Sequence, residues 1–391
     1  MEKSIFKFTD FRKAQVFNFF RYISDALIFV FLPLFFSSLQ LSSFETGTLL
    51  ASVPIMAIVG NVVMSLLAKS AKRNILLIQI IMPFEIVSAC MIGFFSNFYI
   101  VLIISIIMNF CNSSFYSLLD GICSQIASSA KKNYVAIRVF GSIAYLISSL
   151  FSGFLIDAIN YKFTFLLAGI IWLLDYILLY FIKVDNEEDK KENDSNLTSN
   201  PFKSKAFIAY TIFYIFSISA SHACDTFFSV YAKNIREVNA SVYGILYSTM
   251  ILTEIIVMIV TIFVKFKKQY LMLLFSAIFL FLRVFLLCFE LPKTILYIVP
   301  SLRGIGWGLL LAYHINTLKK FLNSKQLVKA IFVLTIGLHI IVAIIDQFGP
   351  HIVELTDSYQ ILFIILTCIS AVGLFAISFI NIFNLVKKNN K

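Results

Sequence analysis

Charged residues are scarce in this 391-residue chain, where Asp, Glu, Lys and Arg together make up 14% of the sequence. Soluble globular proteins carry roughly 25% charged residues and about 45–50% apolar ones. Here the apolar fraction is 60%, with 43 Phe and 17 Tyr, which is more than a soluble core can bury. The composition therefore excludes a soluble globular protein and predicts a protein whose solvent is lipid.

Several chemical motifs are also lacking. The six cysteines form no CxxC pair and no metal-type spacing, so we expect them to be small apolar fillers of helices. No GxxxxGKS/T phosphate loop is present, which argues against ATP drive within this chain. No HxxxxD-like motif or metal cluster accompanies the histidines. The sequence thus predicts a protein that is not an enzyme and that uses no cofactor and no metal.

Apolar runs long enough to cross a bilayer, about 20 residues each, fill most of the chain. The first run follows the charged N-terminus MEKSIFKFTDFRKAQ without a small-residue cleavage site, so we expect a membrane helix there and not a cleaved signal peptide. Twelve runs are found, at 12–36, 44–68, 74–95, 98–128, 135–157, 163–183, 205–231, 241–264, 270–290, 294–319, 327–348 and 360–386.

Lysine and arginine are unequally distributed between the two sides of these runs. With the N-terminus inside, the inner segments hold 24 of them and the outer loops 4, and four arginines lie in or at the edge of spans. This bias predicts that both termini are cytoplasmic in a multi-pass protein of the cytoplasmic (inner) membrane. It also accounts for the net charge of +11 without a nucleic-acid partner.

One long hydrophilic segment divides the spans six and six. Residues 183–205 are rich in charge, Asn and Ser, and predict a flexible cytoplasmic linker over 184–204 between bundles at 1–183 and 205–391. The halves echo each other weakly, as in SSFETGTLL after the first span and NASVYGILY after the seventh. We therefore expect an all-α polytopic protein of two six-helix bundles. Its layout resembles the major facilitator fold, although hydropathy alone permits other polytopic folds.

Ionisable residues recur inside the spans, where each costs about 2.5–3.5 kcal/mol on insertion scales. Such groups persist when they are paired or face a water-filled cavity. Where they recur every three to four residues, they form a polar stripe on one helix face. Such stripes on spans 1, 4, 7 and 10 predict a solute and proton pathway, and they include Arg21, Asp25, Tyr116, Asp120, Asp225, Arg303, Trp307 and His314.

Residues 120–145, DGICSQIASSAKKNYVAIRVFGSIAY, resemble the span 4–span 5 hairpin of the lactose permease family and the neighbouring phenylpropionate transporter family. Asp120 and Arg138 are eighteen residues apart, as are the sugar-binding acid and arginine of the lactose permease family. Tyr145 stands where that family has a Trp that stacks on the sugar. The resemblance implies that these three residues bind substrate. With the stripes, the expected substrate-binding set also contains Asp25, Arg21, Tyr116, Arg303 and Trp307.

The second half resembles the phenylpropionate family better, in ASHACDTFFSVYAKN and in the span 8 segment GILYSTMILTEIIVM. This resemblance implies Glu254 as a proton-coupling residue. Both families have a His where Arg303 stands, and the proton-carrying Glu of the lactose permease family falls at Gly306. Residues 133–157 lack the prolines typical of drug antiporters, which argues against drug efflux. The expected proton-coupling set is Glu254, Asp225, His222, Arg283 and His314.

Together these features predict a secondary active transporter that symports a small organic solute with protons by alternating access, with Arg138 pairing with Asp120 when empty. The sequence does not choose between an organic or aromatic acid, a sugar and a nucleoside as the solute. The sequence also permits a membrane enzyme, a non-transporting solute sensor, and an exporter or uniporter. The expected partners are the solute and the bilayer, without nucleic acid or nucleotide, and the protein is expected to be a monomer driven by the proton gradient.

For two of the charged pairs a purely structural role is also open. Arg21 and Asp25 are i,i+4 neighbours that can simply neutralise each other. Glu254 can form a salt bridge with Arg283 on the next span instead of carrying a proton.

Overall fold

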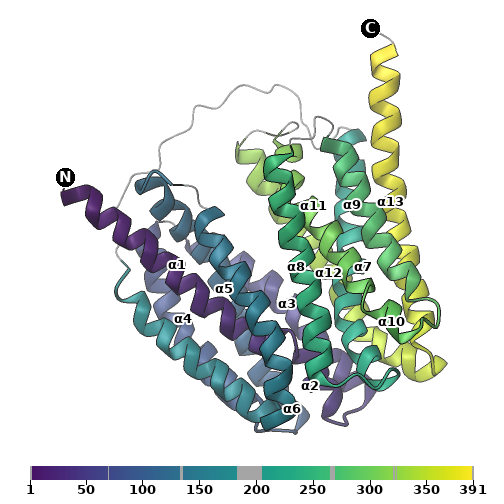
Figure 1. The fold of residues 1–391 in the computed structure, drawn as a ribbon, viewed down its shortest axis with the longest axis horizontal. Coiled ribbons are helices and arrows are strands. Elements are labelled where there is room, and N and C mark those ends of the chain that lie inside the picture. Colours follow the sequence, from purple (N-terminus) through teal and green to yellow (C-terminus); the bar gives the residue numbers. More distant parts are fainter. Residues whose placement is uncertain are drawn as a thin grey trace. The chain divides into compact units, whose positions relative to one another are not determined.

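The computed structural model describes residues 2–68, 70–132, 135–182, 205–264, 269–319, 322 and 324–389. Regular secondary structure within these ranges is helical, without a strand (Figure 1). The chain divides into two compact units, residues 1–190 with 232–248 and residues 191–231 with 249–391. The predicted linker at 184–204 lies outside the described residues, and the division at this linker stays a prediction.

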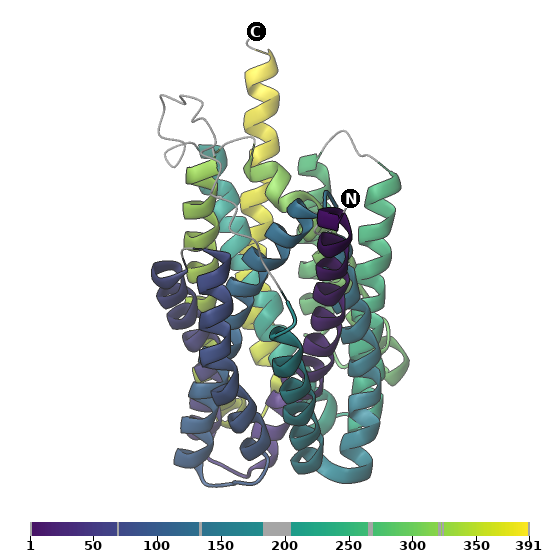
Figure 2. The ribbon, with the colours of Figure 1, turned by 90° about the vertical axis from the view of Figure 1, so that its left-hand side faces the viewer.

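The first unit is a bundle of long helices with one short one. α5 packs against both α3 and α4, while α6 packs against α1 and α4 (Figure 2). Its helices are α1 (Glu2–Phe29), α2 (Leu32–Ser38), α3 (Ser43–Leu67), α4 (Ala71–Ile92), α5 (Phe98–Ser129) and α6 (Val135–Leu179).

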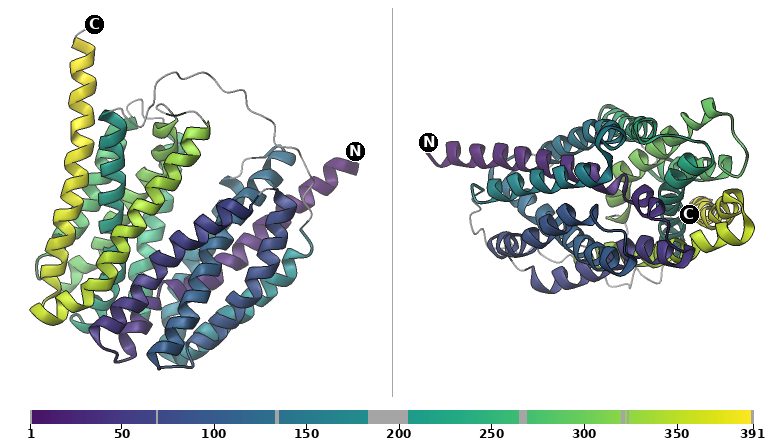
Figure 3. Two further views of the ribbon diagram at one scale, coloured as in Figure 1. Left: turned by 180° about the vertical axis from the view of Figure 1, so that it is seen from behind. Right: turned by 90° about the horizontal axis from the view of Figure 1, so that it is seen from below.

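The second unit is a bundle in which α9 packs against α11 and α13 (Figure 3). The helices of the second unit are α7 (Lys205–Asn234), α8 (Ala240–Phe263), α9 (Gln269–Leu286), α10 (Lys293–Leu296), α11 (Val299–Leu318), α12 (Ser324–Thr356) and α13 (Tyr359–Asn389). The end of α7 and the start of α8 belong to the first unit.

Eleven helices of the described ranges are long and apolar enough to cross a membrane. One of them, Ile137–Leu179, is 43 residues long and contains most of the two predicted spans 135–157 and 163–183. It is interrupted at Asn160, whose φ of 65° and ψ of 175° are not helical. The expected fifth and sixth spans are therefore the two arms of α6, joined without a loop, and the other predicted spans each match a helical segment.

Local sequence explains where several helices begin. Ser42 and Glu45 form a capping box at the start of α3, because each side chain accepts a hydrogen bond from the other residue's backbone N–H. Asn97 Oδ1 accepts from the backbone N–H groups of Tyr99 and Ile100 at the start of α5. Pro33 occupies the first turn of α2, where no backbone donor is needed.

The outer helix faces carry large apolar side chains that are mostly exposed. Leu66, Phe84, Phe263 and Phe375 are each at least 60% exposed. Apolar surface on this scale is typical of lipid contact. Between the helices, small residues permit close approach, as at Gly304 of α11, where an added Cβ would overlap the backbone oxygen of Met250 in α8.

Candidate functional site

A buried arginine joins two helices of the first unit. Arg21 of α1 donates from Nη1 to Glu85 Oε2 at 2.8 Å and from Nη2 to Oε1 at 2.6 Å. Its Nε lies 3.4 Å from Oδ1 of Asp25, one turn further along α1. All three side chains are at most 3% exposed. The two parallel hydrogen bonds are the strongest arrangement of a guanidinium and a carboxylate, and they hold α1 to α4.

Aromatic rings enclose the guanidinium of Arg21. Its Cζ lies 3.8 Å from the ring centroid of Phe115 and 5.5 Å from that of Tyr116, both on α5. Trp172 of α6 lies 4.6 Å away. The faces of these rings attract the cation and exclude water from the ion pair. In this structure both Nη atoms of Arg21 are directed to a protein carboxylate and not to a cavity.

A third carboxylate lies in the same region. Asp175 of α6 is fully buried and interacts electrostatically with Arg21, Asp25 and Glu85. Neither of its oxygens has a hydrogen-bond partner among the described residues, whereas Asp25 accepts from Asn112 Nδ2 at 3.5 Å. We call Arg21, Asp25, Glu85 and Asp175 the first-unit charge cluster. It places one cation among three acids.

The second unit holds a network with a different charge balance. Asp225 Oδ1 of α7 lies 2.5 Å from Arg283 Nη1 of α9, and its Oδ2 lies 3.3 Å from Arg303 Nη2 of α11. Arg303 Nη1 donates to Glu254 Oε2 of α8 at 3.2 Å. The side chains of Asp225 and Glu254 remain 17% and 15% exposed. These four residues form the second-unit charge cluster, which contains two cations and two acids.

Aromatic and imidazole rings lie beside this second cluster. The guanidinium carbon of Arg303 is 4.9 Å from the ring centroid of Trp307, and the ring of His222 meets Trp307 edge-on at 5.2 Å. Further along α11, His314 stacks on Tyr214 of α7 at 4.7 Å. All five side chains are on α7 or α11. These two helices thus combine flat ring faces with hydrogen-bonding groups.

The two units use corresponding helices for a buried ion pair, with the charges exchanged. In the first unit the cation Arg21 is on the first long helix and the acid Glu85 is on the third, α4. In the second unit the acid Asp225 is on the first long helix, α7, and the cation Arg283 is on the third, α9. This arrangement fits the weak repeat between the halves of the sequence.

The hairpin that carries the family resemblance is only partly described. Arg138 lies in the first turn of α6 with an exposed side chain. The side chain of Asp120 lies outside the described residues, so its pairing with Arg138 stays a prediction. Tyr145 has its ring centroid 6.3 Å from that of Tyr22, which is 5.4 Å from the ring of Tyr116. The structure therefore brings Tyr116 and Tyr145 together through Tyr22.

Two members of the first-unit charge cluster, Glu85 and Asp175, are missing from the set expected from the sequence. Each is the only acid in its apolar run, which is the signal that could have found them. In the second unit, Glu254 has Arg303 as a partner and Arg283 has Asp225. The expected proton-coupling residues Glu254, Asp225 and Arg283 thus form ion pairs, and the roles assigned to them stay predictions.

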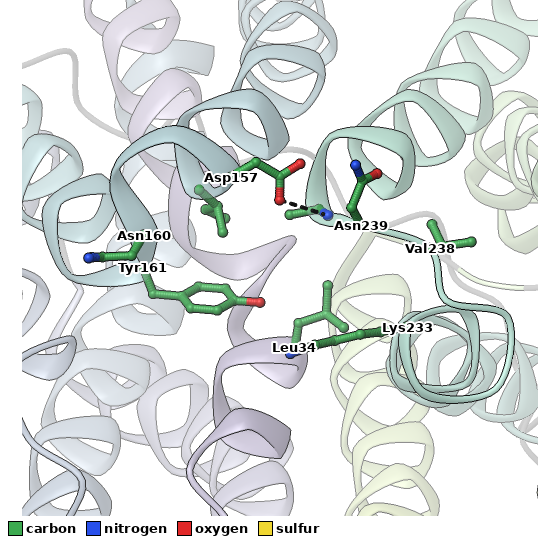
Figure 4. Close-up of a pocket in the computed structure, with 9 residues that line it drawn as sticks. Leu34, Asp157, Asn160, Tyr161, Lys233, Val238 and Asn239 are labelled. Atoms are coloured by element: carbon green, nitrogen blue, oxygen red, sulfur yellow. Dashed lines mark hydrogen bonds between the residues drawn. The ribbon is translucent and has the colours of Figure 1, made fainter.

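A cavity of about 370 Å³ lies in the first unit, at the kink of α6 (Figure 4). The carboxylate of Asp157 accepts hydrogen bonds from the backbone N–H groups of Ala240 and Ser241 at 3.2 and 2.8 Å. Tyr161 points into the cavity, and Lys233 Nζ lies 5.9 Å from its ring centroid. The acid of this cavity is therefore engaged in capping the start of α8.

Comparisons with known proteins agree with this architecture. The model of the family described as Major Facilitator Superfamily matches residues 16–345. A crystal structure of a mutant of the nucleoside transporter NupG is similar with a TM-score of 0.77 and 13% identity, covering 95% of this chain and 99% of that one. A second NupG crystal structure gives 0.73 and 14%, covering 95% and 98%. No curated protein matches by sequence. The predicted fold of two six-helix bundles is confirmed.

Proposed function

The chain belongs to the major facilitator superfamily, and from this membership we propose that it carries a small organic solute across the cytoplasmic membrane. We propose that it acts as a transporter and not as an enzyme, which its family membership supports. In this fold the two bundles alternately expose one site to either side of the membrane. We propose the same cycle here, in a monomer with both termini cytoplasmic.

The charge balance of the two clusters favours an uncharged solute. The second-unit charge cluster contains two arginines and two acids that contact one another, so it offers no net positive charge to a carboxylate. The first-unit charge cluster contains more acids than cations, and its paired side chains are buried and not exposed to a solute. An organic acid would therefore have to displace an acid that is already paired. This argument supports a sugar or a nucleoside over an aromatic acid.

The rings of the second unit favour a nucleoside over a sugar, and they are the observation that carries the proposal. Trp307 and His222 meet beside Arg303, and Tyr214 and His314 stack on the same two helices. A nucleobase offers a flat face to such rings, and the ribose hydroxyls can bond with the partly exposed acids Asp225 and Glu254. The fold's likeness to a nucleoside transporter supports the same choice.

We propose that the driving force is a proton gradient. Intramembrane acids and histidines mark proton pathways in transporters, and Glu254, Asp225 and His222 remain the expected participants in the second unit. A solute that bonds with Asp225 or Glu254 competes with Arg303 for the same acids. That exchange of partners gives the solute different contacts in the two states, which any ligand-driven switch requires.

The test is uptake by purified protein in liposomes under an imposed pH gradient. Labelled nucleosides, sugars and aromatic acids are offered in parallel, and we expect accumulation of a nucleoside. Trp307→Ala should abolish it, whereas Trp307→Phe, which keeps a ring face, should retain part of it. Accumulation of an aromatic acid alone, or an unchanged rate in Trp307→Ala, would contradict the proposal.

A further inference from the structure

The first-unit charge cluster cannot be electrically balanced by its own side chains. It contains three carboxylates and one guanidinium, and every one of these side chains is at most 3% exposed. Glu85 receives both Nη donors of Arg21, and Asp25 lies against Nε and Asn112. Asp175 alone has no donor on either oxygen among the described residues. A buried carboxylate without a donor is the form that a protein interior disfavours most.

From this imbalance we propose that Asp175 carries a proton and that this proton is exchanged with water during the transport cycle, making the first unit a proton-coupling site. The proposal rests on the proposed function, because it names where the driving ion binds. A protonated Asp175 has a neutral side chain, and its hydroxyl turns an acceptor-only group into a donor. The proton neutralises one of the two excess negative charges.

A proton fits this place better than a metal ion. Within the described ranges, no group of three or more His, Cys, Asp or Glu side chains is arranged to hold a metal ion. The charged groups that interact electrostatically with Asp175 are Arg21 and Asp25 of α1 and Glu85 of α4. By contrast, both acids of the second-unit charge cluster contact an arginine.

Release and uptake of the proton are a simple exchange with water. When water reaches Asp175, the O–H bond of its carboxyl group breaks and the proton passes to water as hydronium, leaving a carboxylate. That carboxylate competes with Asp25 and Glu85 for Arg21. The bidentate contact that joins α1 to α4 is thereby weakened until a proton returns from water on the other side of the membrane.

The first test is the infrared spectrum of the purified full-length protein near neutral pH. We expect a protonated-carboxyl stretching band that shifts in heavy water and that loses a component in Asp175→Asn. The amide imitates the shape of a neutral carboxyl group, so this variant should fold, and Asp175→Ser replaces it if it does not. The control is Asp157→Asn, because the carboxylate of Asp157 accepts two backbone hydrogen bonds and its variant should leave the band unchanged. An unchanged band in the Asp175 variants would overturn the proposal, whether or not the protein transports.

The second test is uptake in liposomes with and without a pH gradient. Asp175→Asn should lose the acceleration by the gradient while it still exchanges labelled for unlabelled solute, because exchange needs no net proton movement. Asp157→Asn should keep the acceleration. Gradient-driven accumulation at the wild-type level in Asp175→Asn, or drive by a sodium gradient instead, would overturn the coupling role. Absence of any uptake by the wild type would count against the proposed function. The infrared band would still show whether Asp175 carries a proton.

Discussion

Arg21 and Glu85 meet through two parallel hydrogen bonds inside a shell of aromatic rings, and so tie α1 to α4. Asp225 and Arg283 repeat the contact between α7 and α9 with the charges exchanged. Each unit therefore has an ion pair between its first and third long helices. A cycle in which bundles move as rigid bodies needs this internal stiffness.

Glu85→Gln should destabilise the protein strongly. It breaks the bidentate contact with Arg21, whose side chain is 0% exposed. Because Asp25 still lies against Nε of Arg21, we expect the low end of the cost of breaking a buried pair, about 3 kcal/mol. For a unit of this size we expect the melting temperature in detergent to fall by at least about 6 °C. The measurement is thermal unfolding followed by intrinsic fluorescence.

The double variant Arg21→Met with Glu85→Leu distinguishes a charge effect from a packing effect. With Asp25→Asn added to both the single and the double variant, so that Asp25 is not left as a buried carboxylate without Arg21, removing both charges of the pair should recover most of the lost stability. A double variant as unstable as Glu85→Gln would show that the shape of the pair, and not its charge, holds α1 to α4.

Asp225→Asn should reduce uptake by at least about tenfold, an effect on the order of 1.4 kcal/mol. Asp225 is the residue that contacts both Arg283 and Arg303, so its loss leaves two arginines with one acid, Glu254. The cluster then carries a net positive charge, and we expect anionic solutes to bind better than they do to the wild type. The measurement is uptake of a nucleoside together with its inhibition by aromatic acids.

A matched control for this variant is Glu354→Gln. Glu354 is 63% exposed and is paired with His351 near the end of α12, where ion pairs contribute little. Equal loss of uptake in both variants would mean that the assay reports general damage and not the charge balance around Arg303.

The fold follows from the sequence because each span is a long apolar run that hydropathy identifies directly. The join between the fifth and sixth spans cannot be predicted in this way, because it depends on the backbone conformation of one residue. Asn160 turns the chain with a positive φ, at a kink between two helical arms. Residues Asp157–Lys162 therefore form a tight kink, although their polar character predicts an ordinary loop.

The candidate site follows from the sequence less completely. An arginine or acid in an apolar run indicates that a partner exists, but it does not say which helix supplies that partner. The i,i+4 spacing predicts that Arg21 pairs with Asp25, its neighbour on the same helix, whereas its closer contact is with Glu85, 64 residues away. Periodicity describes one helix at a time, and the choice among several acids is made by tertiary packing.

Asn160→Gly should be tolerated and should raise stability. The backbone of Asn160, at φ 65° and ψ 175°, lies in a region that essentially only glycine adopts without strain, and other residues pay about 1–3 kcal/mol there. Asn160→Val should lower the melting temperature, because a β-branched residue tolerates a positive φ poorly. Equal melting temperatures for the Gly and Val variants would contradict the strained kink.

Arg138→Ala should abolish accumulation of solute without loss of protein from the membrane. The side chain of Arg138 is exposed, and replacing an exposed residue usually changes stability by only about 0.5 kcal/mol. Arg138→Lys should fail as well, because an ammonium group keeps the charge but lacks the planar fork that holds two oxygens at once. Arg73→Ala, at an exposed arginine in the first turn of α4, is the matched control and should transport normally. Normal accumulation by Arg138→Ala would remove this residue from the solute path, and full activity in the Lys variant alone would reduce its role to that of a charge.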